Sequence, residues 1–235
     1  MLGPLAMKNK WENGLLSELG YWKWTMKQPC YGEMKDRDSK NKPLDSFVRS
    51  LCPQNTKEKI KILDVGCGPL SPLGLVSDIQ IQIIGVDPLA DRYKEMLIKH
   101  SVNTNSELFP VQGKAESLVL LFGNNMFDVT VSFNSLDHMA DPLVAIRQMT
   151  RVTKHGGVIY VWCYENEGLF EDYKGLHQWN VELKDNHVFV WRENYRKSLD
   201  EIVNGFAEIK KTWKSKKHNK DIVHFILTID KKEIV

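Results

Sequence analysis

Long apolar runs and an excess of either charge are missing from this chain. No apolar stretch approaches the roughly 20 residues that a helix needs to span a bilayer, and the start of the chain lacks a signal-peptide core. The formal net charge is only +2. The densest basic stretch, residues 210–220, lies between two strand-like runs, so we interpret it as the solvated tip of a hairpin. We therefore expect no stable membrane insertion and no nucleic-acid partner.

Cysteine is scarce and shows no pairing pattern. The four cysteines, Cys30, Cys52, Cys67 and Cys163, form no C-x-x-C motif, and two of them fall in predicted core elements. This pattern is typical of reduced thiols in the cytoplasm, and it predicts neither a disulfide framework nor a zinc site. We therefore expect a cytoplasmic protein and predict no metal ligands. The sequence does not predict an oligomeric state.

The chain also lacks the complete glycine pattern of a dinucleotide-binding loop. The run 60–65 is apolar and β-branched, as in a buried parallel strand, and Gly66 and Gly68 follow it. A dinucleotide-binding loop has another glycine three residues later, but Ser71 stands there. The Asp64 carboxylate would also repel a pyrophosphate, whereas it suits the ammonium group of an amino acid. The missing third glycine and the Asp64 carboxylate therefore disfavour a nucleotide-dependent oxidoreductase. For the two glycines themselves, the alternative to a ligand-binding loop is an ordinary tight turn.

The rest of the chain alternates strand and helix patterns, which predicts parallel strands joined by right-handed crossovers. Residues 8–25 and 43–51 are expected to be helical, the second with proline in its first turn. Further predicted strands are 81–86, 108–112, 127–133, 158–163 and a short one at 187–191, and further predicted helices are 73–79, 90–100, 143–152 and 199–206. Two alternating runs, 208–213 and 222–229, are expected to close the sheet as an antiparallel pair.

An acidic residue ends the second predicted strand. Asp87 follows the glycine loop by about twenty residues, where a carboxylate can accept hydrogen bonds from both hydroxyls of a ribose. The alternative is an aspartate that caps the next helix.

Four ordered segments carry a resemblance to a known family. They are Asp-Val-Gly-Cys-Gly at 64–68, Gly-Lys-Ala-Glu-Ser-Leu at 113–118, the strand and Leu-Asp-His turn at 127–142, and the Gly-Gly turn at 154–157. Together they resemble the motifs of class I methyltransferases, which use S-adenosyl-L-methionine (SAM) and release S-adenosyl-L-homocysteine (SAH). The resemblance implies a Rossmann-like fold, with a mostly parallel seven-stranded sheet, an antiparallel C-terminal hairpin and helices on both faces. One departure is Leu70, where the family often has a third glycine.

The resemblance also implies roles for particular residues. It places the methionine end of SAM at the glycine loop, the ribose at Asp87, the adenine near 115–116 and the methyl group near 133–134. The implied cofactor residues are Asp64, Gly66, Cys67, Gly68, Asp87, Pro88, Leu89, Ala115, Glu116, Phe133 and Asn134.

Catalytic and acceptor-binding residues are less sharply indicated. His138 follows the fourth strand and could take a hydroxyl proton, or it could simply bond a nearby carbonyl. His177 is the competing base or a substrate donor, and Asp137 could orient a histidine. Expected acceptor contacts are Trp22, Tyr164, Glu165, Gln178 and Trp179, with Trp24 as a further aromatic candidate; core packing is the alternative for the tryptophans.

Three segments of the sequence resemble one subgroup of this family more closely. SLDHMADPLVAIRQM at 135–149, GLHQWN at 175–180 and a tryptophan-rich N-terminal helix resemble methyltransferases of bacterial capsule and other surface-polysaccharide clusters. This implies O-methylation of a sugar or phosphate-type group on a glycan precursor; another small metabolite or a non-catalytic SAM-binding role are alternatives. We expect a helical cap over 1–55, a methyltransferase domain over 56–235 and a substrate loop at about 164–195.

Overall fold

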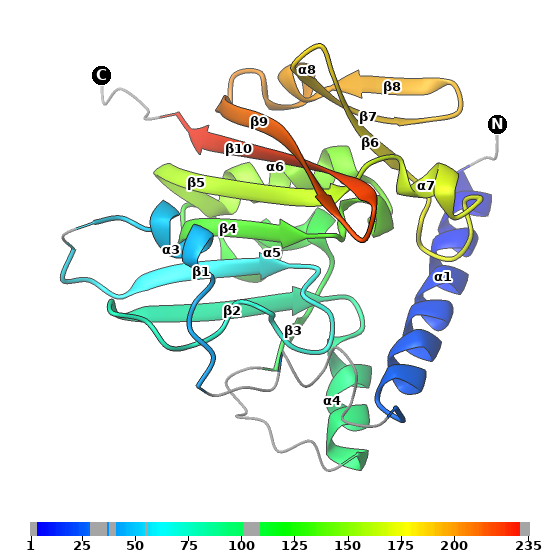
Figure 1. The fold of residues 1–235 in the computed structure, drawn as a ribbon, viewed down its shortest axis with the longest axis horizontal. Coiled ribbons are helices and arrows are strands. Elements are labelled where there is room, and N and C mark those ends of the chain that lie inside the picture. Colours follow the sequence, from blue (N-terminus) through cyan, green and yellow to red (C-terminus); the bar gives the residue numbers. More distant parts are fainter. Residues whose placement is uncertain (1–3, 29–36, 38–40, 55, 101–108, 231–235) are drawn as a thin grey trace.

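The protein folds around a seven-stranded sheet with the order β3-β2-β1-β4-β5-β10-β9 (Figure 1). The computed structural model describes residues 4–28, 37, 41–54, 56–100 and 109–230, with the backbone alone for 4–9. The sheet strands are β1 (Ile60–Val65), β2 (Ile81–Asp87), β3 (Val111–Gln112), β4 (Phe127–Phe133), β5 (Thr153–Tyr164), β9 (Ala207–Lys217) and β10 (Lys220–Ile229). β1 to β5 are parallel, and β10 runs antiparallel to both β5 and β9.

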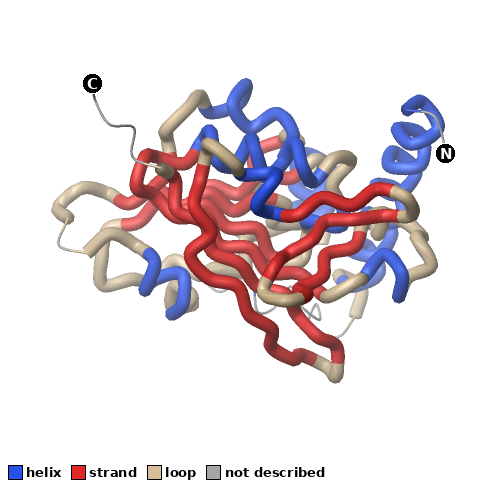
Figure 2. Tube along the Cα trace, turned by 90° about the horizontal axis from the view of Figure 1, so that it is seen from above, coloured by secondary structure: helices blue, strands red, loops and turns tan. Residues whose placement is uncertain are grey.

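Helices cover both faces of this sheet, as Figure 2 shows from above. They are α1 (Pro4–Thr25), α3 (Ser46–Leu51), α4 (Ala90–Lys99), α5 (Leu118–Phe122), α6 (Pro142–Val152), α7 (Glu167–Phe170) and α8 (Leu199–Val203), with short 3-10 turns η3 (Ala115–Ser117) and η4 (Leu136–His138). On one face α6 buries Ile146, Met149 and Val152. On the other, α3 packs on a core that includes Val48 and Ile62. The predicted Rossmann-like architecture is confirmed: a mostly parallel seven-stranded sheet, an antiparallel C-terminal hairpin and helices on both faces.

The parallel strands bring their carboxyl ends to one edge of the sheet. β1 is the central strand, hydrogen-bonded to β2 on one side and β4 on the other. The arrowheads of these three strands point toward α1 in Figure 1. Ligands of open α/β sheets bind at this edge, and the loops after β1, β2 and β4 all begin there.

Two predicted helices differ from the structure. Residues 73–79 form irregular turns, because Gly74 has a positive φ of 86° and the backbone amides of Leu75 and Val76 bond the carbonyl of Lys42. The helix predicted from Pro43 begins instead at Ser46, where the Asp45 side chain caps it through Val48 N–H at 3.0 Å.

The segment 164–195, where a substrate loop is predicted, is largely regular structure. It contains α7 and the strands β6 (Asn180–Lys184) and β7 (His187–Arg192). β7 is the middle strand of a three-stranded antiparallel sheet and pairs with β6 on one side and β8 (Tyr195–Ser198) on the other. Asp185 and Asn186, both at positive φ, form the tight turn between β6 and β7. Two-residue turns of this kind match the twist of hairpin strands.

Helix α1 stands beside the carboxyl edge of the sheet and packs its buried Leu19 and Trp22 against Tyr93 of α4. Gly14 explains how closely α1 approaches the chain that carries His177, since a Cβ there would lie 2.7 Å from the carbonyl oxygen of Gly175. A glycine inside a helix is otherwise unfavourable, so at this position its small size allows the contact.

This contact gives a matched pair of predictions within one helix. Gly14→Ala should lower the free energy of unfolding by roughly 1–3 kcal/mol, because the methyl group overlaps backbone. Gly20→Ala should raise it by about 0.5–1 kcal/mol, because a Cβ there meets nothing within 4 Å and alanine favours helix. Urea denaturation of both variants measures this. If both substitutions stabilise the protein, the close contact does not exist.

The structure also describes the cysteines and the helices about which the composition gives expectations. Cys52, Cys67 and Cys163 are buried free thiols, while Cys30 lies outside the described residues. Among the described helices, none combines the length and apolarity that crossing a membrane requires.

Candidate active site

A cavity of about 750 Å³ opens at the carboxyl edge of the sheet, between the strand ends and α1. This volume lies within the range of small-molecule and cofactor pockets. All eleven residues expected to bind the cofactor line it, although they come from four separate segments, at or after the ends of β1, β2, β3 and β4. His138, His177, Trp22 and Tyr164 line the same cavity.

The glycine loop has the sharp backbone that a close approach to a ligand requires. Gly66 and Gly68 have positive φ values of 70° and 68°. A Cβ on Gly66 would lie 2.5 Å from Oγ of Ser135, and Ser135 in turn donates to the carbonyl of Val65 at 3.0 Å. The turn after β4 therefore packs directly on the loop after β1, which fixes both sides of the cavity relative to each other.

Asp64 places a buried carboxylate beneath this loop. It is 1% exposed, and its Oδ2 accepts a hydrogen bond from Ser71 Oγ at 2.6 Å. Its Oδ1 is buried and has no hydrogen-bond partner among the residues that the structure describes. Burial raises the pKa of Asp64 to about 6, although Ser71 and the charge of Arg37 oppose the shift. A buried acceptor without a partner is costly, so an ammonium group here would satisfy it.

Asp87, at the end of β2, is held by two backbone amides. Its Oδ2 accepts from Gly68 N–H at 3.0 Å and its Oδ1 from Leu89 N–H at 2.8 Å. Burial raises its pKa to about 7 against these bonds, and the charges of Glu18 and Asp64 add to the rise. Each carboxylate oxygen can accept a further hydrogen bond, so two neighbouring hydroxyls of a ribose fit this carboxylate.

The residues expected around the adenine lie beyond Asp87. Pro88 and Leu89 follow β2, and Ala115 and Glu116 lie in η3 after β3. The Glu116 carboxylate accepts from the Asp141 backbone N–H at 3.0 Å, so it also ties η3 to the start of α6. Together they form an apolar slot with one acidic edge.

At the other end of the cavity, Phe133 and Asn134 close the fourth strand. Asn134 has a left-handed backbone, with φ of 50°, and its N–H bonds the carbonyl of Trp162 at 2.7 Å. This conformation turns the chain from β4 into η4, which carries Asp137 and His138.

Asp137, His138 and His177 form one tight cluster. Nδ1 of His177 lies 2.7 Å from Oδ2 of Asp137 and 3.1 Å from Nε2 of His138, and the latter atom lies 3.6 Å from the same carboxylate oxygen. Asp137 is 1% exposed, and within the described part of the chain its Oδ1 has no hydrogen-bond partner. The cluster joins residues 39 positions apart in the chain.

The surroundings of this cluster are electronegative. Burial lowers the pKa of His177, but the hydrogen bond and charge of Asp137, with the charges of Glu167 and Glu171, outweigh it and hold the pKa above its usual value. The neighbouring backbone is well fixed, since Trp11 donates its Nε1–H to the carbonyl of His138 at 2.8 Å. The cluster can therefore attract a proton or another cation.

Three of the expected acceptor contacts do not line the cavity. Glu165 pairs with Lys214 and accepts from Leu183 N–H at 3.0 Å, and Gln178 donates to the carbonyls of Tyr173 and Gly175. Trp179 is buried in the main core at 3% exposed. These contacts build the chain around His177. Trp24, the further aromatic candidate, is 60% exposed.

Sequence reasoning missed Arg37, which falls in a mixed-charge stretch that reads as surface loop. Its Nη1 donates to the carbonyls of Cys67 and Leu70 at 2.7 and 3.0 Å, and its guanidinium lies over the Trp22 ring. The glycine loop thus has a cation beside it, which suits a carboxylate ligand. No periodicity or spacing in the sequence signals this long-range contact.

The raised pKa values predict a pH dependence. In the ligand-free fold Asp64 and Asp87 take up protons at about pH 6 and about pH 7, above their usual range, so the fold binds more protons than the unfolded chain. Stability without ligand should therefore fall as pH rises from about 4 to about 7. Affinity for an ammonium-bearing nucleoside should rise over about pH 5 to 8, because both carboxylates must ionise. Calorimetric titration with SAH across this range, with melting temperatures at each pH, tests both trends; a flat affinity profile would contradict them.

Comparison with known proteins agrees with this geometry. Residues 63–161 match the family model described as "Methyltransferase domain". An uncharacterized methyltransferase of Schizosaccharomyces pombe is 35% identical over 115 residues, 46% of this chain and 41% of that protein. A ubiquinone biosynthesis O-methyltransferase of Pseudomonas fluorescens is 30% identical over 53% of this chain and 55% of that protein. The chain thus spans about half the length of the curated relatives it matches.

Solved structures show the same fold at low identity. The methyltransferase complexed with the Trm112 activator of Haloferax volcanii superposes with a TM-score of 0.56 at 13% identity, covering 93% of this chain and 99% of that one. The cyclase SpnF gives 0.56 at 15% identity, covering 94% and 96%. A phosphoethanolamine N-methyltransferase of Haemonchus contortus, solved with SAH, gives 0.54 at 14% identity, covering 91% and 57%.

Residues 63–161 thus resemble the methyltransferase domain family, and the described chain has the fold of class I methyltransferases, whose cofactor is SAM. The residues present fit this group. The partnerless oxygen of buried Asp64 suits its ammonium, the positive-φ glycines allow close approach, and Asp87 suits its ribose.

Proposed function

We propose that this protein is a SAM-dependent methyltransferase that methylates an oxygen of a small acceptor. The observation that carries the proposal is the buried Asp64 Oδ1 without a partner, in the same cavity as the two histidines. The names of curated relatives support oxygen as the acceptor, since they include ubiquinone biosynthesis and tocopherol O-methyltransferases.

In this proposal the chain contributes alignment and activation of the acceptor. The sulfonium of SAM already activates the methyl group, so an in-line displacement needs a positioned oxygen that loses its proton. His138 and His177 would act on that hydroxyl, and Asp137 would hold His177 through the 2.7 Å hydrogen bond. Phe133 and Asn134 would line the methyl end of the cofactor.

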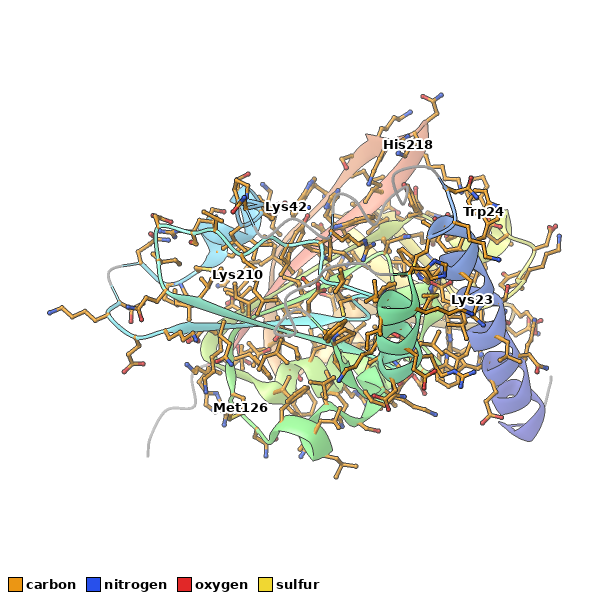
Figure 3. The ribbon with its side chains drawn as sticks, turned by 90° about the horizontal axis from the view of Figure 1, so that it is seen from below. Lys23, Trp24, Lys42, Met126, Lys210 and His218 are labelled. Carbon is orange, nitrogen blue, oxygen red and sulfur yellow. The ribbon has the colours of Figure 1, made fainter. Side chains whose placement is uncertain are left out.

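We further propose that the acceptor is a sugar or phosphate-type group of a surface-glycan precursor. Aromatic side chains of Trp11, Trp162 and Tyr164 line the cavity and could stack on a sugar ring. Lys217 and His218 also line it, and Figure 3 shows His218 at the tip of the β9–β10 hairpin. These groups would suit an anionic precursor. The helical cap over 1–55 and a cytoplasmic location stay predictions.

Transfer of a labelled methyl group tests the proposal. The full chain, with SAM labelled in its methyl group, would be offered nucleotide sugars, phosphorylated glycan intermediates and catechol-type hydroxyls. Label in a sugar or phosphate oxygen supports the glycan proposal, whereas label only in another small metabolite retains the methyltransferase and rejects that acceptor. Tight SAH binding with no transfer to any acceptor favours a non-catalytic SAM-binding protein.

A further inference from the structure

We infer that Asp137, His138 and His177 form a binding site for a divalent transition-metal ion that would hold and activate the acceptor's oxygen. The inference deepens the proposed function and rests on it for the catalytic role, but the metal site itself can be tested independently. Two observations support the metal site. Three atoms that can bind a metal lie close together, and one buried carboxylate oxygen has no hydrogen-bond partner among the described residues.

The three atoms converge as ligands of one small ion would. Oδ2 of Asp137, Nε2 of His138 and Nδ1 of His177 are 2.7, 3.1 and 3.6 Å apart. Ligands about 2.0–2.1 Å from a tetrahedral zinc ion lie about 3.3 Å from one another. The cluster therefore matches the required spacing, and only small side-chain shifts would centre an ion within it.

Hydrogen bonds alone cannot satisfy all three of these atoms at once. An imidazole nitrogen has a single in-plane position, which holds either a proton or a lone pair. Nδ1 of His177 faces two partners, Oδ2 of Asp137 and Nε2 of His138, and it can serve only one of them fully. A cation accepts a lone pair from all three atoms at once.

The second oxygen of Asp137 is independent support. The side chain is 1% exposed, and its buried Oδ1 has no hydrogen-bond partner in the described ranges of the chain. A buried carboxylate with an unsatisfied oxygen is costly unless a cation compensates its charge. No lysine or arginine is paired with it among the described residues.

The donor set indicates the class of metal. Two imidazole nitrogens and one carboxylate oxygen suit zinc and its transition-metal neighbours, whereas magnesium and calcium prefer oxygen ligands alone. Three protein ligands leave a fourth position for water or substrate, as in catalytic zinc sites. Both histidines line the cavity, while Asp137 lies behind them, so the fourth position would face the cavity.

An ion here would serve the proposed reaction without any redox change. Coordination of the acceptor hydroxyl would lower its pKa, so that its proton leaves to water. The oxygen then forms a bond to the methyl carbon, the bond from that carbon to the sulfonium sulfur breaks, and SAH leaves as a neutral thioether. The ion is unchanged at the end.

The experiment titrates the metal-stripped full chain with Co²⁺, whose visible absorption reports tetrahedral coordination, and with Zn²⁺ by competition. We expect one ion per chain. His138→Ala and His177→Ala should each weaken binding by at least about 100-fold, since even outer-shell changes cost about 10–100-fold. His187→Ala is the matched control, because His187 also pairs with an aspartate, Asp200 at 3.1 Å, but on the exposed surface. SAH binding by each variant confirms that it is folded.

The outcomes separate the two proposals. No tetrahedral Co²⁺ spectrum, or one that persists in both histidine variants, overturns the metal site. Full methyl transfer by the metal-stripped enzyme overturns its catalytic role while leaving the methyltransferase intact, with an imidazole as base. Loss of transfer on stripping and recovery with Zn²⁺ supports it. Failure to bind SAH would reject the proposed function, whatever the metal titration shows.

Discussion

Asp64→Asn should weaken SAM binding by roughly 30- to 1,000-fold, because it removes one partner of a buried charge pair, a loss of about 2–4 kcal/mol. Asparagine has nearly the same shape, so its amide oxygen can still accept the hydrogen bond from Ser71 Oγ. What it cannot supply is the negative charge that, in the proposed binding mode, would face the ammonium of the cofactor. Calorimetric titration with SAM and SAH at pH 8 measures the effect.

The same variant should leave the ligand-free fold at least as stable. Burial raises the pKa of Asp64 to about 6, so at pH 8 the native protein holds an ionised carboxylate that burial disfavours. Removing that charge should not lower the melting temperature. Asp128→Asn is the control, since Asp128 pairs with Lys154 at 2.6 Å and does not line the cavity. Unchanged SAM affinity in Asp64→Asn would contradict the assigned contact.

Gly66→Ala should be the most damaging substitution in the glycine loop. It places a side chain at a φ of 70° and a Cβ 2.5 Å from Oγ of Ser135, so strain and overlap add. We expect a loss of about 2–4 kcal/mol in the free energy of unfolding and no measurable SAH binding. Guanidinium denaturation and calorimetry measure the two effects.

Gly123→Ala is a control that separates the cost of a left-handed backbone from the cost of steric overlap. The φ of Gly123 is 79°, but a Cβ there meets nothing within 4 Å, and it does not line the cavity. Gly123→Ala should therefore cost only about 1–2 kcal/mol from the left-handed backbone and leave SAH binding unchanged. If Gly66→Ala costs no more than Gly123→Ala, Ser135 does not pack against the loop as described.

The main sheet could be predicted because its signals are local. Strands such as 127–133 are short apolar runs bounded by glycine or polar turns, and the helix 143–152 has a clear apolar face and begins next to proline. The Asp64 and Asp87 positions follow from the same logic, since each lies at or next to the carboxyl end of a parallel strand.

The errors lie where long-range contacts decide the structure. Residues 73–79 have apolar spacing for a helix, but Gly74 and hydrogen bonds to Lys42 hold them in turns. Arg37 reaches the glycine loop across 30 residues, a contact without any local pattern. Of the β6–β7 hairpin, only the second strand is predicted, at 187–191. The length and polarity of the segment obscure the alternating residues before Asp185 and Asn186 that form β6.

The cluster of Asp137, His138 and His177 could be predicted from the sequence only in part. His138 and His177 each stand out as catalytic candidates, and Asp137 as a residue that could orient one of them. Their meeting depends on the chain after α7 folding back, held by the bonds of Gln178 to Tyr173 and Gly175. Gln178 thus serves the site indirectly, by positioning His177.

A crystal structure of the full chain grown with SAH tests the central claim most directly. We expect the amino group of SAH within hydrogen-bond distance of Oδ1 of Asp64, its ribose hydroxyls on Asp87, and its sulfur on the side of the cavity that holds His138 and His177. A structure that shows SAH elsewhere, or this cavity empty at saturating SAH, would contradict the account.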